Sequence, residues 1–132
     1  MKKNGMLNSE IAKVLDDLGH TDTLVIGDLG LPVPPGVKKI DVALEIGKPS
    51  FIDLLTLLME EMEVEKITLA TEIKEQNPSQ LVAINEIIGE QSDVVFTSHE
   101  EFKKQCITAK AIIRTGEATP YSNVILQSGV IF

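Results

Sequence analysis

The chain is poor in the residues from which disulfides and metal centres are made. Its 132 residues include one cysteine, Cys106, and two histidines, and tryptophan is absent. A single cysteine cannot close an internal disulfide or supply a thiolate zinc cluster. The histidines, His20 and His99, lie far apart in the sequence and lack carboxylates at ligand spacing. We therefore expect no metal centre, and a small, partly buried thiol at Cys106.

Clustered basic charge and long apolar runs are also scarce. The chain has 12 Lys and Arg against 20 Asp and Glu, which gives a net charge of -8. Nucleic-acid binders need a basic face, so this charge argues against such a partner. No apolar run approaches the roughly 20 residues of a membrane-spanning helix, and the N-terminal segment lacks the apolar core of a signal peptide. We expect no membrane contact and a place in the reducing cytoplasm.

What the chain does have is an alternation of strand-like and helix-like segments. Strands are predicted at 24–26, 39–44, 64–70, 93–97, 111–113 and 124–132. The predicted helices are one capped by Asn8 or Ser9 and stopped by Gly19, one with Pro49 in its first turn, one between Asn77 and Gly89, and a short one at 100–105. At 43% hydrophobic residues, the chain can build one core over residues 1–132. The alternation predicts a single α/β domain, a layered sandwich with a largely parallel central sheet flanked by helices.

The end of the chain breaks this alternation. No helix is predicted between the last two strands, which favours an antiparallel pair at an edge of the sheet. The final residues, Val130 to Phe132, are apolar. We expect them to be tucked into a core or an interface rather than left in water.

Polar residues that could carry chemistry lie at the ends of these predicted elements. His20 follows a predicted helix end, where the helix dipole favours imidazolium, so it is either a proton donor or a cap of helix carbonyls. Asp28 directly follows a buried strand, in the loop 27–36, and ligands usually bind outside the carboxyl ends of strands. The alternative for Asp28 is a turn-stabilising role.

Later segments add a histidine, a lysine and the chain's only tyrosine. His99 follows a predicted strand, and Lys103 lies four residues on, so the two could line a pocket or simply form a solvated helix start. If their segment is extended, Tyr121 and Asn123 point the same way and Ser122 points opposite. A phenol beside a carboxamide suits a carbohydrate, although a core tyrosine and a turn asparagine remain possible.

The polar insert before these residues holds the chain's only arginine. We expect Arg114 and Glu117 to form an internal ion pair that holds the loop.

Three segments in register carry a resemblance to a known family. They are Leu7 to Ile11 with Leu18 to His20, then Gly27 to Pro34, and Ile113 to Asn123. With them the chain resembles the ribose pyranase and fucose mutarotase family over essentially its whole length, and the ribose pyranase branch more closely.

The resemblance implies roles for residues already singled out. It implies that His20 is the proton donor and that sugar is bound by Asp28, His99 and the segment Tyr121, Ser122 and Asn123. It further implies a cytoplasmic, cofactor-free enzyme that interconverts pyranose and furanose D-ribose for ribokinase, in rings of subunits that are often decamers. A fucose-type mutarotase and a non-catalytic sugar-binding module remain the alternatives.

Overall fold

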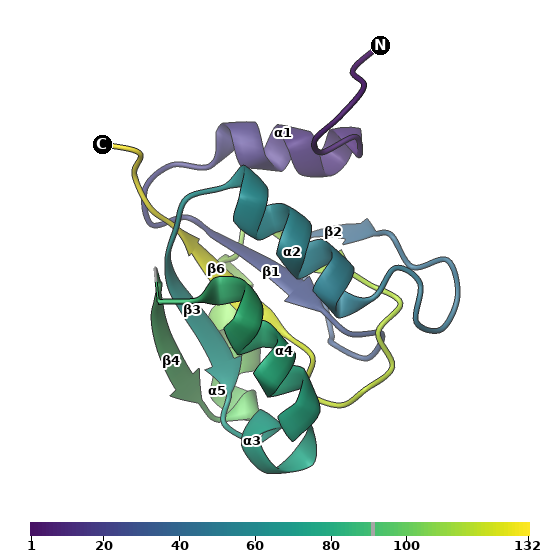
Figure 1. Cartoon of the computed structure of the whole chain (residues 1–132), viewed down its shortest axis with the longest axis vertical. Coiled ribbons are helices and arrows are strands. Elements are labelled where there is room, and N and C mark those ends of the chain that lie inside the picture. Colours follow the sequence, from purple (N-terminus) through teal and green to yellow (C-terminus); the bar gives the residue numbers. More distant parts are fainter. Residues whose placement is uncertain (91) are drawn as a thin grey trace.

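The computed structural model describes residues 1–90 and 92–132, which form a six-stranded mixed sheet with helices on both faces (Figure 1). The strands are β1 (Thr23–Gly27), β2 (Lys38–Asp41), β3 (Val64–Ala70), β4 (Asp93–Thr97), β5 (Ala111–Arg114) and β6 (Val124–Ser128). The helices are α1 (Ser9–Asp17), α2 (Phe51–Glu61), α3 (Ile73–Gln76), α4 (Pro78–Ile88) and α5 (His99–Gln105), and the 3₁₀ turn Cys106–Thr108 follows α5. The predicted α/β architecture with a largely parallel sheet is confirmed.

The strand order across the sheet is β2-β5-β1-β6-β3-β4. β5 is parallel to β1 and β2, β3 is parallel to β4, and β6 is antiparallel to both β1 and β3. All strands except β6 therefore point the same way, and their carboxyl ends lie at the same end of the sheet. We call this end the carboxyl edge and the opposite end the amino edge, as distinct from the outer strands β2 and β4. Figure 1 shows the arrowheads of β1, β3 and β4 directed toward the carboxyl edge and that of β6 directed away from it.

The prediction that the last two strands pair at a sheet edge is wrong. β5 lies between β2 and β1, and β6 lies between β1 and β3. Both are short runs whose apolar residues are buried, at 111–113 and 124–126. Strands covered on both faces belong inside a sheet, whereas the edge strands β2 and β4 expose several of their residues.

Two apolar cores lie on opposite faces of the sheet, and β1 contributes to both. Leu24 and Ile26 join the larger core, which buries residues of α1, α2 and α4. Val25 points to the other face, toward Phe102 of α5 and Cys106. Burial raises the pKa of the Cys106 thiol to about 11, so the thiol stays protonated and unreactive at neutral pH.

The helix ends follow the local signals closely, with small corrections. Asn8 caps α1, and Asn77 caps α4, which Gly89 ends as predicted. α2 begins after Ser50, which forms a capping box with Asp53, so Pro49 precedes the helix instead of lying in its first turn. The four-residue helix α3 was not predicted, because so short a segment has no measurable periodicity.

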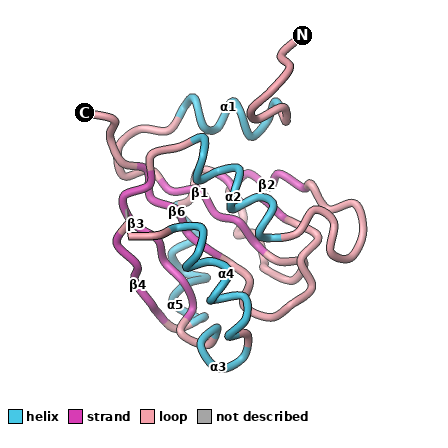
Figure 2. Tube along the Cα trace, in the orientation of Figure 1, coloured by secondary structure: helices cyan, strands magenta, loops and turns pink. Residues whose placement is uncertain are grey.

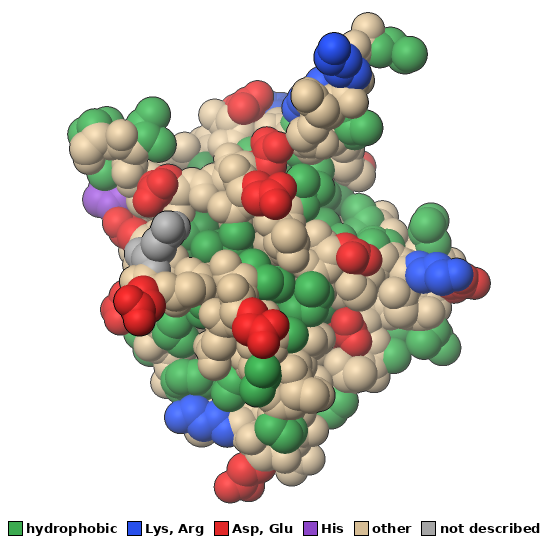
Figure 3. All heavy atoms as spheres, viewed as in Figure 1, with side chains coloured by type: hydrophobic (Ala, Val, Ile, Leu, Met, Phe, Trp, Pro, Cys, Tyr) green, Lys and Arg blue, Asp and Glu red, His purple; other side chains and the backbone are tan. Residues whose placement is uncertain are grey.

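The C-terminal end is not covered within one chain. The sequence predicted a strand that continues to residue 132, but β6 ends at Ser128. Ile131 is 91% exposed and Phe132 fully exposed, so a place in the core is excluded for both. Figure 1 shows the C-terminus near the end of α1. In the same view in Figure 3, the apolar side chains at this place protrude from the rest of the molecule. Among the described residues, no helix has the length and apolarity needed to cross a bilayer.

Candidate active site

A small hollow lies at the carboxyl edge of the sheet, where ligands of α/β proteins usually bind. It is formed by the loop that follows β1, the loop that connects β5 to β6 and the first residue of α5, and Figure 2 shows the two loops as long irregular segments. The hollow is lined by Asp28, Gly30, Leu31, His99, Pro120, Tyr121 and Asn123. Its volume of about 250 Å³ is below the range of roughly 300–1,000 Å³ for drug-sized ligands, and it therefore suits a molecule of monosaccharide size.

Asp28 and Asn123 are locked together on one side of this hollow. The backbone N–H of Asp28 donates to Asn123 Oδ1 at 2.8 Å, and Asn123 Nδ2 donates to Asp28 Oδ2 at 3.2 Å. Gly30 N–H donates to the other carboxylate oxygen, Oδ1, at 2.9 Å. Asn123 is buried, and the carboxylate is fixed in one orientation because Asn123 Nδ2 holds one of its oxygens and Gly30 N–H holds the other. A carboxylate held in this way is a preorganised acceptor for ligand hydroxyls.

The His99 ring lines the same hollow. Its Nδ1 is buried and has no hydrogen-bond partner among the residues that the structure describes. The ring lies edge-on to Tyr121, with centroids 5.2 Å apart, and is stacked on Phe102 at 6.2 Å. The backbone N–H of His99 donates to both carboxylate oxygens of Glu72, at 3.0 and 3.1 Å, which fixes the start of α5. Buried polar atoms are normally hydrogen-bonded, and within the described chain Nδ1 is an exception.

The segment of Tyr121 is not extended. Tyr121 has a φ of +56°, in the left-handed region that costs a non-glycine residue about 1–2 kcal/mol. Strained backbone of this kind gathers at ligand sites, where the surrounding structure holds it. Tyr121 and Asn123 nevertheless both line the hollow.

The Ser122 side chain is used inside the protein. Its hydroxyl accepts from Gln80 Nε2 at 3.0 Å and from Asn77 Nδ2 at 3.3 Å, and lies 2.9 Å from Thr119 Oγ1. Ser122 is fully buried, so its side chain anchors the loop and does not face the hollow.

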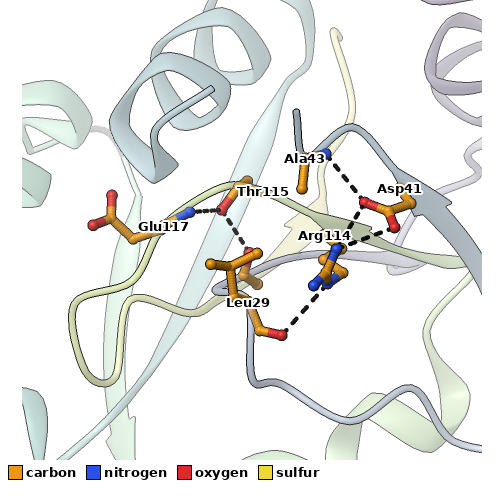
Figure 4. A network of polar contacts seen from close by, with 7 residues as sticks. Leu29, Asp41, Ala43, Arg114, Thr115 and Glu117 are labelled. Carbon is orange, nitrogen blue, oxygen red and sulfur yellow. Dashed lines mark hydrogen bonds and ion pairs between the residues drawn. The ribbon is translucent and has the colours of Figure 1, made fainter. Parts of the chain in front are cut away.

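Thr115, which the sequence did not single out, ties the loops of the hollow together. Its Oγ1 donates to the carbonyl of Gly27 at 2.8 Å, and the backbone N–H of Leu29 donates to the carbonyl of Glu117 at 2.9 Å. The predicted ion pair between Arg114 and Glu117 is wrong. Arg114 contacts Asp41, with Nη1 3.2 Å from Oδ2, and its Nε donates to the carbonyl of Leu29 (Figure 4).

The structure places Lys103 outside this hollow. Its Nζ lies 2.7 Å from Glu100 Oε1, and its side chain lines a neighbouring depression between the proline-rich loop and α5. A larger hollow, of about 360 Å³, is lined by Lys13, Lys38 and Lys110. Each of these lysines faces a carboxylate, those of Asp17, Glu10 and Asp22, so this hollow offers a ligand little unmatched charge.

His20 lies at the opposite edge of the sheet. α1 ends at Asp17, with Leu18 as its C-cap, so His20 is in the turn before β1 and not at a helix end. The sequence predicted that the helix dipole acts on His20, but His20 lies beyond the last helical turn, to which that effect is confined. Residues 20 and 28 bracket β1, and at about 3.3 Å per residue they are on the order of 20 Å apart. One chain does not bring His20 and Asp28 together.

The half-buried carboxylate of Asp28 leads to a test of how stability depends on pH. Burial raises the pKa of Asp28 above its ordinary value of 3.8, although Gly30 and Asn123 partly oppose this by hydrogen bonding. The folded state thus binds this proton more tightly than the unfolded chain, so Asp28 opposes folding above its raised pKa, and this effect fades as the pH falls toward 3.8.

We therefore expect the stability of the native protein, relative to the Asp28→Asn variant, to rise between about pH 7 and about pH 4. Urea unfolding of both proteins over this range measures the difference. A difference that stays constant with pH, or that falls as the pH is lowered, contradicts the argument.

A carboxylate, a carboxamide, an imidazole and a phenol around a small hollow at the carboxyl edge define an α/β protein equipped to hold a small polar ligand. The chain belongs to the RbsD / FucU transport protein family, whose model matches residues 1–131. The family resemblance inferred from the sequence is thereby confirmed.

Individual relatives agree with the family. The chain is 59% identical over 130 residues to the D-ribose pyranase of Lactococcus lactis subsp. lactis (strain IL1403), which covers 98% of each chain. It is 58% identical over 132 residues to the D-ribose pyranase of Exiguobacterium sibiricum, which covers 100% of both.

Among solved structures, Bacillus subtilis RbsD complexed with D-ribose superposes with a TM-score of 0.96 at 55% identity, over 100% of both chains. The fucose mutarotase of Streptococcus pneumoniae in complex with L-fucose has a TM-score of 0.79 at 22% identity, over 96% of this chain and 95% of that one. The latter likeness shows the shared fold alone.

Proposed function

We propose that this chain is a D-ribose pyranase, an isomerase that interconverts the pyranose and furanose forms of D-ribose and so supplies furanose to ribokinase. The observation that carries the proposal is the hollow in which Asp28, Asn123, Tyr121 and the imidazole ring of His99 meet. Support comes from the close match, in fold and sequence, to a protein whose structure holds D-ribose. Residues 1–132 act as one domain in this proposal, in the cytoplasm and without a cofactor.

The lining of the hollow matches the surface of a pentose. The Asp28 carboxylate and the Asn123 amide accept from and donate to ring hydroxyls, and the His99 imidazole makes one further hydrogen bond. The Tyr121 ring covers an apolar face of the sugar. Ser122 contributes by fixing the loop, because its hydroxyl is already engaged by Gln80 and Asn77. We leave Lys103 out of this set, because its ammonium is paired with Glu100.

Ring exchange needs one proton delivered and one removed. Imidazolium at His20 protonates the ring oxygen while a base, Asp28 or His99 directly or through water, takes the proton of the anomeric hydroxyl. The bond between the anomeric carbon and the ring oxygen breaks, and the open aldehyde forms. A different hydroxyl then attacks the aldehyde carbon: neutral His20 takes the proton of that hydroxyl, and the protonated base returns its proton to the carbonyl oxygen. Both groups end in their starting protonation states. Positioned proton transfer contributes roughly 10²–10⁴-fold, enough for a reaction that already proceeds slowly in water.

These roles require more than one chain. His20 and Asp28 lie at opposite edges of the sheet, so a complete site needs His20 from one subunit and the Asp28 hollow from another. A homo-oligomer, for which we propose a decameric ring assembly, supplies both halves. The exposed apolar residues Ile131 and Phe132 line the same depression as His20, and a neighbouring subunit seated there would cover them.

Saturation-transfer NMR on D-ribose tests the proposal. Catalytic amounts of the protein should raise the exchange rate between pyranose and furanose anomeric protons, and L-fucose is measured alongside. Unfolded protein at the same concentration is the control. Exchange of L-fucose alone would indicate a fucose-type mutarotase instead, and ribose binding without faster exchange would indicate a binding module.

A further inference from the structure

A chain of hydrogen bonds runs across the amino edge of the sheet and ends at His20. Gln127 Nε2, on β6, donates to Glu65 Oε1 at 2.6 Å, and Glu65 Oε2, on β3, lies 2.9 Å from His20 Nε2. These residues come from three separate segments and meet only through the fold. The contact joins residues 45 positions apart, and the hydrogen bond from Gln127 keeps the carboxylate in place.

Two backbone features aim these side chains at each other. The β3–β6 register shifts between Val64 and Lys66, so Glu65 lies at an irregularity of the bulge type. Bulges re-aim side chains and are over-represented next to active sites. On the other side, Thr21 adopts a φ of +72° and its N–H donates to the carbonyl of Ser128 at 2.9 Å, which fixes the turn that carries His20.

The electrostatics keep Glu65 ionised. The hydrogen bond from Gln127, followed by the one from His20, lowers the pKa of Glu65 below its ordinary value of 4.5. A carboxylate only accepts hydrogen bonds, so the imidazole nitrogen facing it must carry hydrogen. The opposite nitrogen, Nδ1, is then the one left to exchange a proton, in the manner of other carboxylate–histidine pairs that set the tautomer.

We propose that Glu65 is the positioning residue of the catalytic histidine: it holds hydrogen on Nε2 of His20 and fixes the ring, so that Nδ1 delivers the proton to the sugar. Glu65 acts through His20 and does not touch the substrate. The inference rests on the proposed function in one respect, namely that His20 is catalytic. The tautomer of His20 is a property of the resting protein and does not depend on turnover.

The tautomer is measurable without turnover. Magic-angle-spinning NMR of protein labelled with ¹⁵N-histidine reports which ring nitrogen carries hydrogen, and the chain has only two histidines to assign. A His99→Gln variant removes one of the two signal sets. At a pH where the His20 ring is neutral, we expect hydrogen on Nε2 in the native protein and a mixture of both tautomers in Glu65→Ala.

Turnover gives the second readout. In Glu65→Ala we expect kcat for ribose exchange to fall by roughly 10–100-fold, the loss found when a carboxylate partner of a functional histidine is removed, with KM nearly unchanged. The matched control is Glu63→Ala, which removes an equal charge from the depression that His20 lines. Neither kcat nor the tautomer should change in it.

Three outcomes would overturn the assignment: hydrogen on Nδ1 in the native protein, an unchanged tautomer in Glu65→Ala, or an unchanged kcat in that variant. Failure of the proposed function looks different. The native protein would then fail to accelerate ribose exchange, while the NMR measurement would still decide whether Glu65 fixes the His20 ring.

Discussion

Replacing His20 by alanine is expected to lower the catalysis of ribose ring exchange by roughly 10²–10⁴-fold, the contribution of one positioned proton donor. Affinity for D-ribose should change little, because the groups that hold the sugar lie at the other edge of the sheet. The His20 side chain is 53% exposed and its hydrogen bond is with the surface residue Glu65, so the variant should fold normally. Saturation-transfer NMR measures the rate, and titration calorimetry measures the affinity.

The second histidine provides the matched control. His99→Ala removes a ring that lines the hollow and stacks on Phe102, so it should weaken ribose binding. Loss of affinity is thus expected in His99→Ala and not in His20→Ala. If His20→Ala turned over ribose like the native protein, another group would have to be the proton donor.

Mixing two inactive variants is expected to restore activity. His20→Ala keeps an intact Asp28 hollow, and Asp28→Asn keeps an intact His20. Suppose that each site takes His20 from one subunit and the Asp28 hollow from its neighbour. Random mixing in equal amounts should then give about one complete site in four, because His20 must come from an Asp28→Asn subunit and the hollow from a His20→Ala subunit. Co-refolding the variants and measuring exchange should therefore recover activity from a baseline near zero.

The control for this experiment comes from a single edge. Asp28→Asn and His99→Ala both damage the same hollow, so mixing them should recover nothing. Equal recovery in both mixtures, or recovery in neither, would contradict a site shared between subunits.

Local signals in the sequence predicted the elements better than their arrangement. The ends of α4 followed from Asn77 and Gly89, whose side chain or backbone freedom acts within a few residues, whereas the start of α2 was predicted slightly too early, at Pro49. The place of β6 depended on pairing with distant strands, although its continuous apolar run was a usable sign of a strand covered on both faces.

The candidate site divides in the same way. Its residue types could be selected from the sequence, because Asp28 and His99 directly follow strands whose carboxyl ends meet at one edge. The direction of the buried Ser122 side chain could not be predicted from the sequence. It depends on the left-handed backbone of the neighbouring Tyr121, which the surrounding structure imposes. The partnership of His20 with Glu65 was equally hidden, because it exists only once β3 and β1 have been brought into one sheet.

The position of β6 also bears on how the protein folds during its synthesis. Chains emerge from the ribosome amino end first, and here the strand that joins β1 to β3 is synthesised after all the others. Until residues 124–128 have emerged, β1 and β3 each have an open edge and the apolar residues of that gap remain uncovered. A nascent chain therefore cannot complete this sheet until residues 124–128 are available, and until then the facing edges of β1 and β3 stay open to pairing with other chains.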